Sequence, residues 1–297
     1  MLEVLESLED TIKRFAMNEQ DLIADANIGD TIIQVAQTRK FFNGETIVVR
    51  DSDQGEIRVI DKIIDEKTFT ITEPLVRSWT VAEGSLVQKA PGGQYVKRIY
   101  YGDPTVIPDY PAITIMGDSR DEEWWTINST KKTWNCTITV LVEDASDEES
   151  YKTMLKLAKT IEEGLWINRW PIFDTTFETD VITDGNSGDF ILEVDDTSGF
   201  RAKDQIVIED LDRTQQNQIK RVIDEHNILL EAELIWDFKV SEGATVLVPS
   251  RWVMWSKPES TDYGFVHKDT LLKAAQIKWF AEEEVCRLQP YVGPTKF

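Results

Sequence analysis

The apolar and polar positions of residues 30–88 fall into short runs that predict a β-rich segment. Valine, isoleucine, threonine and phenylalanine fill the runs, and glycine and aspartate separate them, which is typical of strands joined by tight turns. The predicted strands cover residues 30–35, 45–50, 57–64, 67–72 and 85–88. Five short strands of this kind are enough to build a small barrel or sandwich.

The same pattern recurs later in the chain. Asn27-Ile28-Gly29-Asp30 returns as Asn186-Ser187-Gly188-Asp189, an offset of 159 positions. The offset holds without a gap through matched pairs that include Phe41 and Phe200, Ile47-Val48 and Ile206-Val207, Ile64-Asp65-Glu66 and Ile223-Asp224-Glu225, and Val87 and Val246. A match of this length indicates a duplicated unit. We therefore predict two all-β domains, at 26–89 and 176–249.

Three pieces of chain remain, at 1–25, 90–175 and 250–297. Helical spacing of apolar residues predicts amphipathic helices at 2–17 and 151–166. The other predicted elements are strands at 94–101, 112–115 and 252–255, a hairpin of 124–127 and 133–142 around a turn at 128–132, a polar loop at 258–263, and a segment at 270–280 that begins helical and ends as a strand. The predicted fold class is α+β: a discontinuous host domain with a mixed sheet and two packed helices, into which two small β-domains (barrels or sandwiches) are inserted.

One phrase of the repeat resembles the small β-modules common in phage virion proteins. In those modules a strand leads to a T-x-G-F turn and then to a D-x-I-x-I strand. Here the turn is Thr197-Ser198-Gly199-Phe200 and the following strand is Asp204-Gln205-Ile206-Val207-Ile208. The resemblance implies a virion component and no particular activity.

The host pieces resemble the tail terminator proteins of tailed bacteriophages in the order of their elements. Ile107-Pro108-Asp109-Tyr110-Pro111-Ala112-Ile113 is similar to a V-P-x-Y-P-A-I phrase of that family, with Ile in the first place. Residues 271–279 follow a closing L-x-x-A-x-x-I-x-W phrase. The two β-domains depart from the plain family pattern, so interface residues do not transfer directly, and we expect these domains on the outer rim of a ring.

The resemblance implies a function and a set of partners. Proteins of this family form hexameric rings that cap the tail tube, stop its polymerisation and offer a surface to the neck, joining head to tail. The expected partners are further copies of this chain, the tail tube protein, the neck connector and, in a contractile tail, the sheath subunit. DNA is expected to pass through the lumen without specific binding. The expected location is the virion, assembled in the host cytoplasm.

Charge limits the alternatives. The chain carries 32 basic and 54 acidic residues, a net charge of -22. Such a chain is poorly suited to grip DNA or an anionic membrane, because both require clustered cations. A negative ring lumen would repel DNA, but we favour the simpler interpretation that acidity maintains solubility. We expect neither a signal peptide nor a membrane span, and we expect Cys136 and Cys286 to be free thiols.

Catalytic and metal-binding patterns are weak. Neither His226, whose repeat counterpart is Lys67, nor His267 lies in a cluster with ligand spacing. Asp51 and Asp53 recur as Asp210 and Asp212, a pattern that favours a solvated hairpin tip over an ion site. The glycines at 92–93 lack the Lys and Ser/Thr of a phosphate loop, and no serine nucleophile elbow occurs. We expect no enzymatic activity, no cofactor and no metal.

The tryptophans suggest where subunits meet. Ten tryptophans are present, and three of them cluster on the predicted hairpin. Tryptophan anchors both cores and interfaces. If 124–127 is a strand, its two adjacent tryptophans point to opposite faces, so one of them points away from the core. The candidate oligomer or tube interface comprises Trp124, Trp125, Trp134, Lys131, Lys132 and Tyr110.

Three other functions stay open. The first is another neck or baseplate component, such as a head-completion protein. The second is a carbohydrate-binding adhesion protein that uses aromatics of the repeats as sugar platforms. Against it, Phe41, Phe69 and Trp79 lie in or beside apolar runs and are expected in the core. The third is a hydrolase, for which no residue pair stands out.

Overall fold

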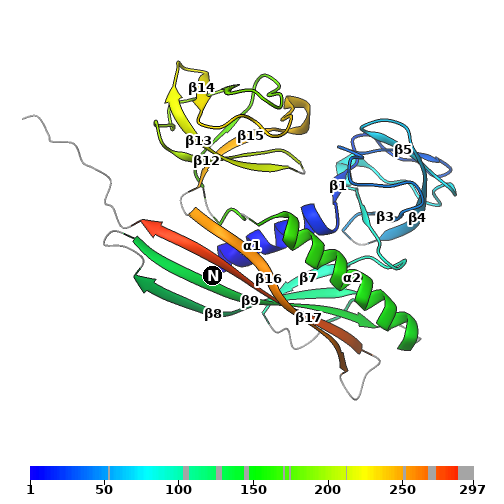
Figure 1. Cartoon of the computed structure of the whole chain (residues 1–297). Coiled ribbons are helices and arrows are strands. Elements are labelled where there is room, and N and C mark those ends of the chain that lie inside the picture. The colour runs from blue at the N-terminus through cyan, green and yellow to red at the C-terminus, as the bar shows by residue number, and fades with distance from the viewer. Residues whose placement is uncertain are drawn as a thin grey trace, which may run out of the picture.

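The structure is a computed structural model that describes residues 1–52, 54–102, 107–124, 129–143, 147–169, 171–173, 175–211, 213–249, 252–266 and 272–286. Within this part the chain is mostly β, with three sheets and two α-helices, which agrees with the α+β class in its general outline. One five-stranded sheet carries the helices, and two six-stranded sheets form separate bodies beside it (Figure 1).

The unit that carries the helices is called the host unit here. Its elements are α1 (Leu2–Thr11), the π-helical turn η1 (Ile12–Ala16), β7 (Arg98–Tyr101), β8 (Ala112–Trp124), β9 (Ser129–Glu143), α2 (Asp147–Ile167), β16 (Trp252–Val266) and β17 (Leu272–Cys286). The strand order is β16-β17-β9-β8-β7. Among the described strand pairs of this sheet, β7 and β8 are the parallel one, and a parallel pair requires a connection longer than a hairpin turn.

Both helices lie on one face of the host sheet. Leu8 of α1, Ile12 of η1 and Leu157 of α2 share one buried cluster with alternate residues of β9, such as Ile138 and Val140. Every second residue of the strand therefore packs against the apolar side of the helices, as the sequence predicted.

The two six-stranded sheets are the duplicated units. Barrel 1 consists of β1 (Gln20–Asp21), β2 (Ile32–Gln34), β3 (Thr46–Arg50), β4 (Gly55–Ile63), β5 (Thr68–Ile71), the short helix η2 (Val81–Glu83) and β6 (Leu86–Lys89). Barrel 2 consists of β10 (Thr175–Asp180), β11 (Ile191–Glu193), β12 (Gln205–Glu209), β13 (Thr214–Val222), β14 (Asn227–Leu230), η3 (Val240–Glu242) and β15 (Thr245–Pro249). The offset found in the sequence places the strands of one barrel on those of the other.

Each sheet closes on itself. In barrel 1 the Ile23 N–H donates to the Gln34 carbonyl at 3.1 Å, which joins the end of β1 to β2. In barrel 2 the Ile182 N–H donates to the Glu193 carbonyl at 3.1 Å, at the equivalent positions. These bonds join the two outermost strands of each sheet, so no open sheet edge is left.

The barrel cores repeat as well. The expected core aromatics Phe41, Phe69 and Trp79 are buried, which confirms that prediction. Barrel 2 replaces Trp79 with Phe238 and Phe69 with Ile228 at the same buried positions. Hydrophobic character is kept while volume changes, as expected of a core that can repack.

The sequence missed one strand in each barrel. β1 precedes the predicted start of the first β-domain at residue 26, and β10 lies at the start of the second, before its first predicted strand at residue 190. Both are edge additions that pair with the last strand of their barrel, through partners such as Gln20 and Val87. Such short strands carry little periodic signal, and only the pairing partner defines them.

Three further predictions about the host unit were wrong. The expected loop at 258–263 belongs to strand β16, because an edge strand accommodates Pro258 at a bulge. The segment expected to begin helical is strand β17 from Leu272 onward, since pairing with both β16 and β9 outweighs helix propensity. The expected turn at 128–132 overlaps β9, which starts at Ser129.

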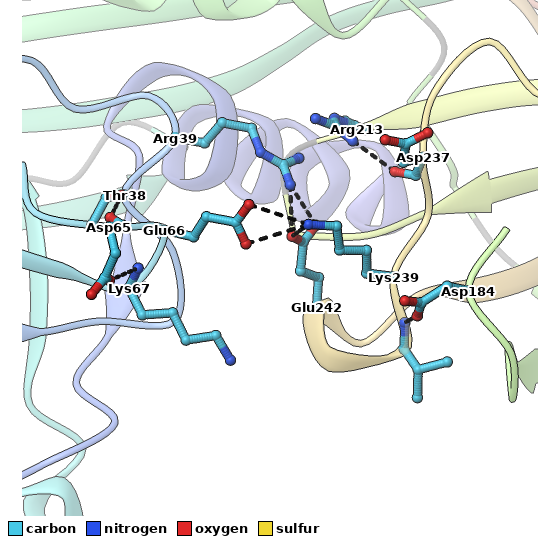
Figure 2. Close-up of polar contacts among 11 residues, drawn as sticks. Thr38, Arg39, Asp65, Glu66, Lys67, Asp184, Arg213, Asp237, Lys239 and Glu242 are labelled. Carbon is cyan, nitrogen blue, oxygen red and sulfur yellow. Dashed lines mark hydrogen bonds and ion pairs between the residues drawn. The ribbon is translucent and has the colours of Figure 1, made fainter. Parts of the chain in front are cut away.

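Polar contacts join the barrels to each other. The Arg39 guanidinium of barrel 1 donates to both carboxylate oxygens of Glu242 of barrel 2, at 2.6 and 2.8 Å. Lys239 of barrel 2 reaches Glu66 of barrel 1 at 3.3 Å (Figure 2). A separate contact links barrel 2 to the helices, because Arg14 of η1 donates to the Asp210 carbonyl at 2.6 Å.

Candidate interaction surface

The face of the host sheet opposite the helices is polar, and it is called the open face here. On β9 the residues that alternate with the buried cluster are hydrophilic, for example Lys131, Asn135 and Thr139. Of the described helices, α1 and α2 are the ones packed on this sheet, and both contribute to the single buried cluster on the other face. A sheet with one apolar and one polar face leaves the polar face accessible to solvent or to a partner.

A hydrogen-bonded ladder crosses three strands at the middle of the open face. Thr137 on β9 donates to Asp118 on β8 at 2.5 Å and accepts from Lys278 on β17 at 2.6 Å. Lys278 also reaches Asp118 at 3.4 Å. Asp118 lies at a register shift between β8 and β9, and such a bulge redirects a side chain. The ladder fixes the relative positions of the polar groups along the face.

An aromatic and ionic cluster occupies the same face on β16 and β17. Trp255 and Phe280 meet edge to face, with ring centroids 4.9 Å apart. The Lys257 ammonium lies 5.1 Å from the Trp255 ring, within the range of a cation–π contact. The Trp255 indole N–H donates to Glu282 at 2.6 Å, and Glu282 also pairs with Lys131 at 2.7 Å. The contact between β9, β16 and β17 is therefore both apolar and charged.

The hydrogen bond to Glu282 and the neighbouring carboxylates raise the pKa of Lys131, which keeps its ammonium charged. Trp255 is 37% exposed, so the indole presents a surface although its N–H is satisfied. An aromatic ring held in one orientation loses little conformational entropy when a partner covers it. These are the properties of an interface anchor.

The structure separates the six residues of the predicted interface. Trp124 ends β8 and is 69% exposed, the most exposed tryptophan of the described chain. Trp134 is buried on the helix side, where its indole N–H donates to Glu283 at 2.7 Å, so it presents no surface. Lys131 faces the open face, and strand alternation places Lys132 on the opposite one.

The other two predicted residues lie elsewhere. Tyr110 is partly buried just before β8, at the opposite end of that strand from Trp124. Burial raises the pKa of its hydroxyl. Trp125 lies outside the described residues. Trp124 and Lys131 lie at the same end of β8 and β9 but on opposite faces of the sheet, because Trp124 pairs with Thr130 whereas Lys131 pairs with Glu123.

Sequence reasoning did not single out Lys257, Phe280 and Glu282. The missed signal was a set of residues two positions apart, which a strand places on one face. They are Trp255 and Lys257 on one strand and Lys278, Phe280 and Glu282 on its partner. It was hidden because Pro258 suggested a loop. The long register between β16 and β17 brings these residues together.

The groups considered for metal binding or catalysis have structural roles where they are described. Asp51 accepts the Gln54 N–H at 2.7 Å, and Asp210 accepts the Arg213 N–H at 2.9 Å, so both aspartates stabilise hairpin turns. The His226 ring is exposed, with Nδ1 2.9 Å from the Asp195 carbonyl. Asp53, Asp212 and His267 lie outside the described residues. In the described part of the chain, no group of three or more His, Cys, Asp or Glu residues could hold a metal ion.

Cys136 is a free thiol in the host core, which confirms that prediction for this residue. Burial, with a smaller effect of Asp118, raises the pKa of the Cys136 thiol to about 12. A thiol that does not ionise near neutral pH is a poor nucleophile. Of Cys286 only the backbone, at the end of β17, is described.

Among the described residues, no helix combines the length and the apolar character needed to span a bilayer. Neither a protein-family model nor a curated protein sequence matches the chain.

Proposed function

We propose that the chain is a non-enzymatic structural subunit of a tailed-phage particle. Several copies, about six by analogy with closed cyclic assemblies of the resembled family, form a ring at the end of the tail tube. The ring caps the tube, connects it to the neck and leaves a lumen through which DNA passes. The two barrels are insertions into the ring-forming host domain.

The one-sided host sheet is the observation that carries this proposal. Its helices cover one face, and its open face, on which neither of the described α-helices packs, displays ordered aromatic and charged side chains. The host elements follow the order helix, edge strand, hairpin, helix, hairpin, and the strand expected at 112–115 is continuous with the first strand of the expected hairpin. A protein that binds copies of itself and a tube needs such extended ordered surfaces.

The connections of the barrels support insertion. The chain enters and leaves barrel 1 at adjacent points, where the Lys89 N–H donates to the Met17 carbonyl at 2.8 Å. In barrel 2 the first and last strands pair from Thr175 with Pro249 onward. Insertions survive at sites where the two connecting ends lie close together. Both barrels stand on the same side of the host unit (Figure 1), so the open face stays free of them.

The adhesion alternative has less support. The repeat aromatics Phe41, Phe69 and Trp79 pack inside barrel 1 and present no platform to a sugar. Another neck or baseplate component would use the same surfaces as a terminator and would differ only in the protein that it binds. Purified protein on a glycan array distinguishes adhesion from both structural roles.

The test is assembly. The mass of the purified protein is measured in solution, and the protein is imaged by negative stain with and without purified tail tubes of the same virus. We expect rings, or caps on tube ends that halt tube growth. A monomer that neither caps tubes nor assembles would refute the terminator function and favour the alternatives.

The exposed tryptophan at the end of β8 provides the first mutational prediction. Trp124→Ala should weaken ring formation or tube capping by about tenfold, because exposed tryptophans dominate interface energies. Trp166→Ala, which removes another partly exposed tryptophan on α2 next to Arg169, is the matched control and should assemble normally. Equal losses in both variants would rule out a specific role for Trp124.

A further inference from the structure

A polar cavity of about 420 Å³ lies between barrel 1 and the segment that leads into β7, the edge strand of the host sheet. The β3–β4 turn and the loop after β5 form one side of it. Tyr95, Lys97, Arg98 and Asp109 of the host unit form the other side. Its volume lies within the range of small-molecule sites. This cavity is separate from the open face and from the residues of the proposed ring interface.

Cations dominate the cavity wall. Arg50, Arg77, Lys97 and Arg98 line it, against two carboxylates, Asp51 and Asp109. The whole chain has the opposite balance, with 32 basic and 54 acidic residues. Four cations around one hollow concentrate positive potential in a chain whose net charge is -22, and low-dielectric walls strengthen that potential.

Most of these cations are not neutralised. Arg77, Lys97 and Arg98 are exposed, and in the described part of the chain no ion pair joins any of the three to a carboxylate. Arg50 pairs with Glu19 at 3.0 Å, but its Nε is buried and has no hydrogen-bond partner among the described residues. A buried guanidinium N–H without a partner is costly, so the Arg50 pairing with Glu19 leaves part of its guanidinium unsatisfied beside the cavity.

Comparison of the two barrels shows that the cavity is specific to barrel 1. The barrels share their cores, yet the wall positions differ: Arg50 corresponds to Glu209, and Arg77 corresponds to Trp236. Gly55 corresponds to Thr214. A Cβ at Gly55 would lie 2.5 Å from the Tyr95 hydroxyl oxygen, so only glycine lets Tyr95 pack into the wall.

We infer that this cavity binds a small oxyanion of the phosphate type. Arginine guanidinium groups match the geometry of phosphate oxygens and donate two parallel hydrogen bonds. Arg77 and Arg98 supply such groups from opposite sides, one from barrel 1 and one from the host unit. Bound oxyanion would therefore hold barrel 1 against β7. This binding does not depend on ring formation.

The experiment is calorimetric titration of the full-length chain with inorganic phosphate and with pyrophosphate at low ionic strength. We expect one site per chain, with affinity that falls as salt is added. The double variant Arg77→Ala/Arg98→Ala should bind about tenfold more weakly or not at all, because two charge-assisted contacts are lost. Both positions are exposed, so the variant should keep the circular dichroism spectrum of the parent.

Arg201→Ala is the matched control. It removes an exposed arginine of barrel 2 whose side chain makes no hydrogen bond or ion pair in the described structure, and it should bind like the parent. A short DNA duplex tests the source of the phosphate. DNA that outcompetes pyrophosphate and loses binding in the double variant would assign the same site to a nucleic-acid phosphate. No binding of any of the three probes, or equal binding by the double variant, would overturn the inference. Neither result bears on ring assembly.

Discussion

At the scale of single residues, close contacts decide roles that residue types do not reveal. Gly164 lies within α2, where glycine is expected only to weaken the helix. A Cβ at Gly164 would lie 2.6 Å from the Ala16 Cβ and 2.7 Å from the Ala16 nitrogen. The glycine therefore allows α2 to approach η1 at backbone distance, and the two small residues set the spacing of the helical layer.

Gly164→Ala should lower stability, although alanine has the higher helix propensity. The added methyl group forces α2 and η1 apart, at a cost of about 1–3 kcal/mol, as for other overpacked sites. Urea titration of the full chain measures the change in the free energy of unfolding. Glu163→Ala, at an exposed neighbouring position of α2, is the control and should change it by less than about 0.5 kcal/mol. A stabilised Gly164→Ala variant would contradict the packing argument.

At the scale of elements, the two barrels share the chemistry of their turns. In barrel 1 Asp65 accepts the Lys67 N–H at 2.8 Å, and in barrel 2 Asp224 accepts the His226 N–H at 2.9 Å. These hydrogen bonds to the ionised carboxylate lower the pKa of both aspartates. The repeated Asp-Glu pair is thus a turn-forming signal, and its recurrence reflects backbone geometry.

Asp224→Ala should lower the free energy of unfolding at neutral pH. In acid, the difference between parent and variant should disappear. The folded pKa of Asp224 lies below its ordinary value of 3.8, so the turn stabilises the fold above that value. The contribution disappears as pH falls through the lowered pKa. Urea titrations of parent and variant from pH 7 down to the acid limit of folding measure the difference. A difference that stays constant below pH 3.8 would exclude the carboxylate as its cause.

At the scale of the whole molecule, charged residues orient the duplicated barrels. Both acids of the contact occur in both copies, since Glu66 matches Glu225 and Glu242 matches Glu83. Each cation of the contact occurs in one barrel and is absent from the equivalent position of the other. Ser198 stands at the position of Arg39, and Thr80 at that of Lys239. Exchanging the two barrels would therefore remove both cations from the contact. Although the barrels are copies of one unit, each uses a different surface to bind the other.

A double-mutant cycle on Arg39→Ala and Glu242→Ala should give a coupling energy of about 1–3 kcal/mol, because Glu242 is only 5% exposed and would lose a guanidinium that donates to both of its carboxylate oxygens. The single variants should also broaden the distance distribution in small-angle scattering as the barrels separate. The exposed pair Lys159 and Glu163 is the control, with coupling below about 0.5 kcal/mol. Zero coupling between Arg39 and Glu242 would mean that other contacts hold the barrels.

Much of the fold could be predicted from the sequence because its determinants are local. Helical spacing located α1 and α2, and alternation located the central barrel strands. The apolar runs of the repeat predicted core positions for Phe41, Phe69 and Trp79, and all three are buried. Each of these signals depends on residues close in the chain, where periodicity reflects burial directly.

Tertiary structure alone decided the rest. β1 is a strand only because β6 pairs with it, and β16 extends through Pro258 only because it lies at a sheet edge. The residues of the candidate surface differ from the predicted ones for the same reason. Trp134 is in the core and Trp255 is at the surface, although both are tryptophans in strands, because the face of each strand is fixed by what packs on the sheet. Long-range pairing, which no local pattern encodes, determined those faces.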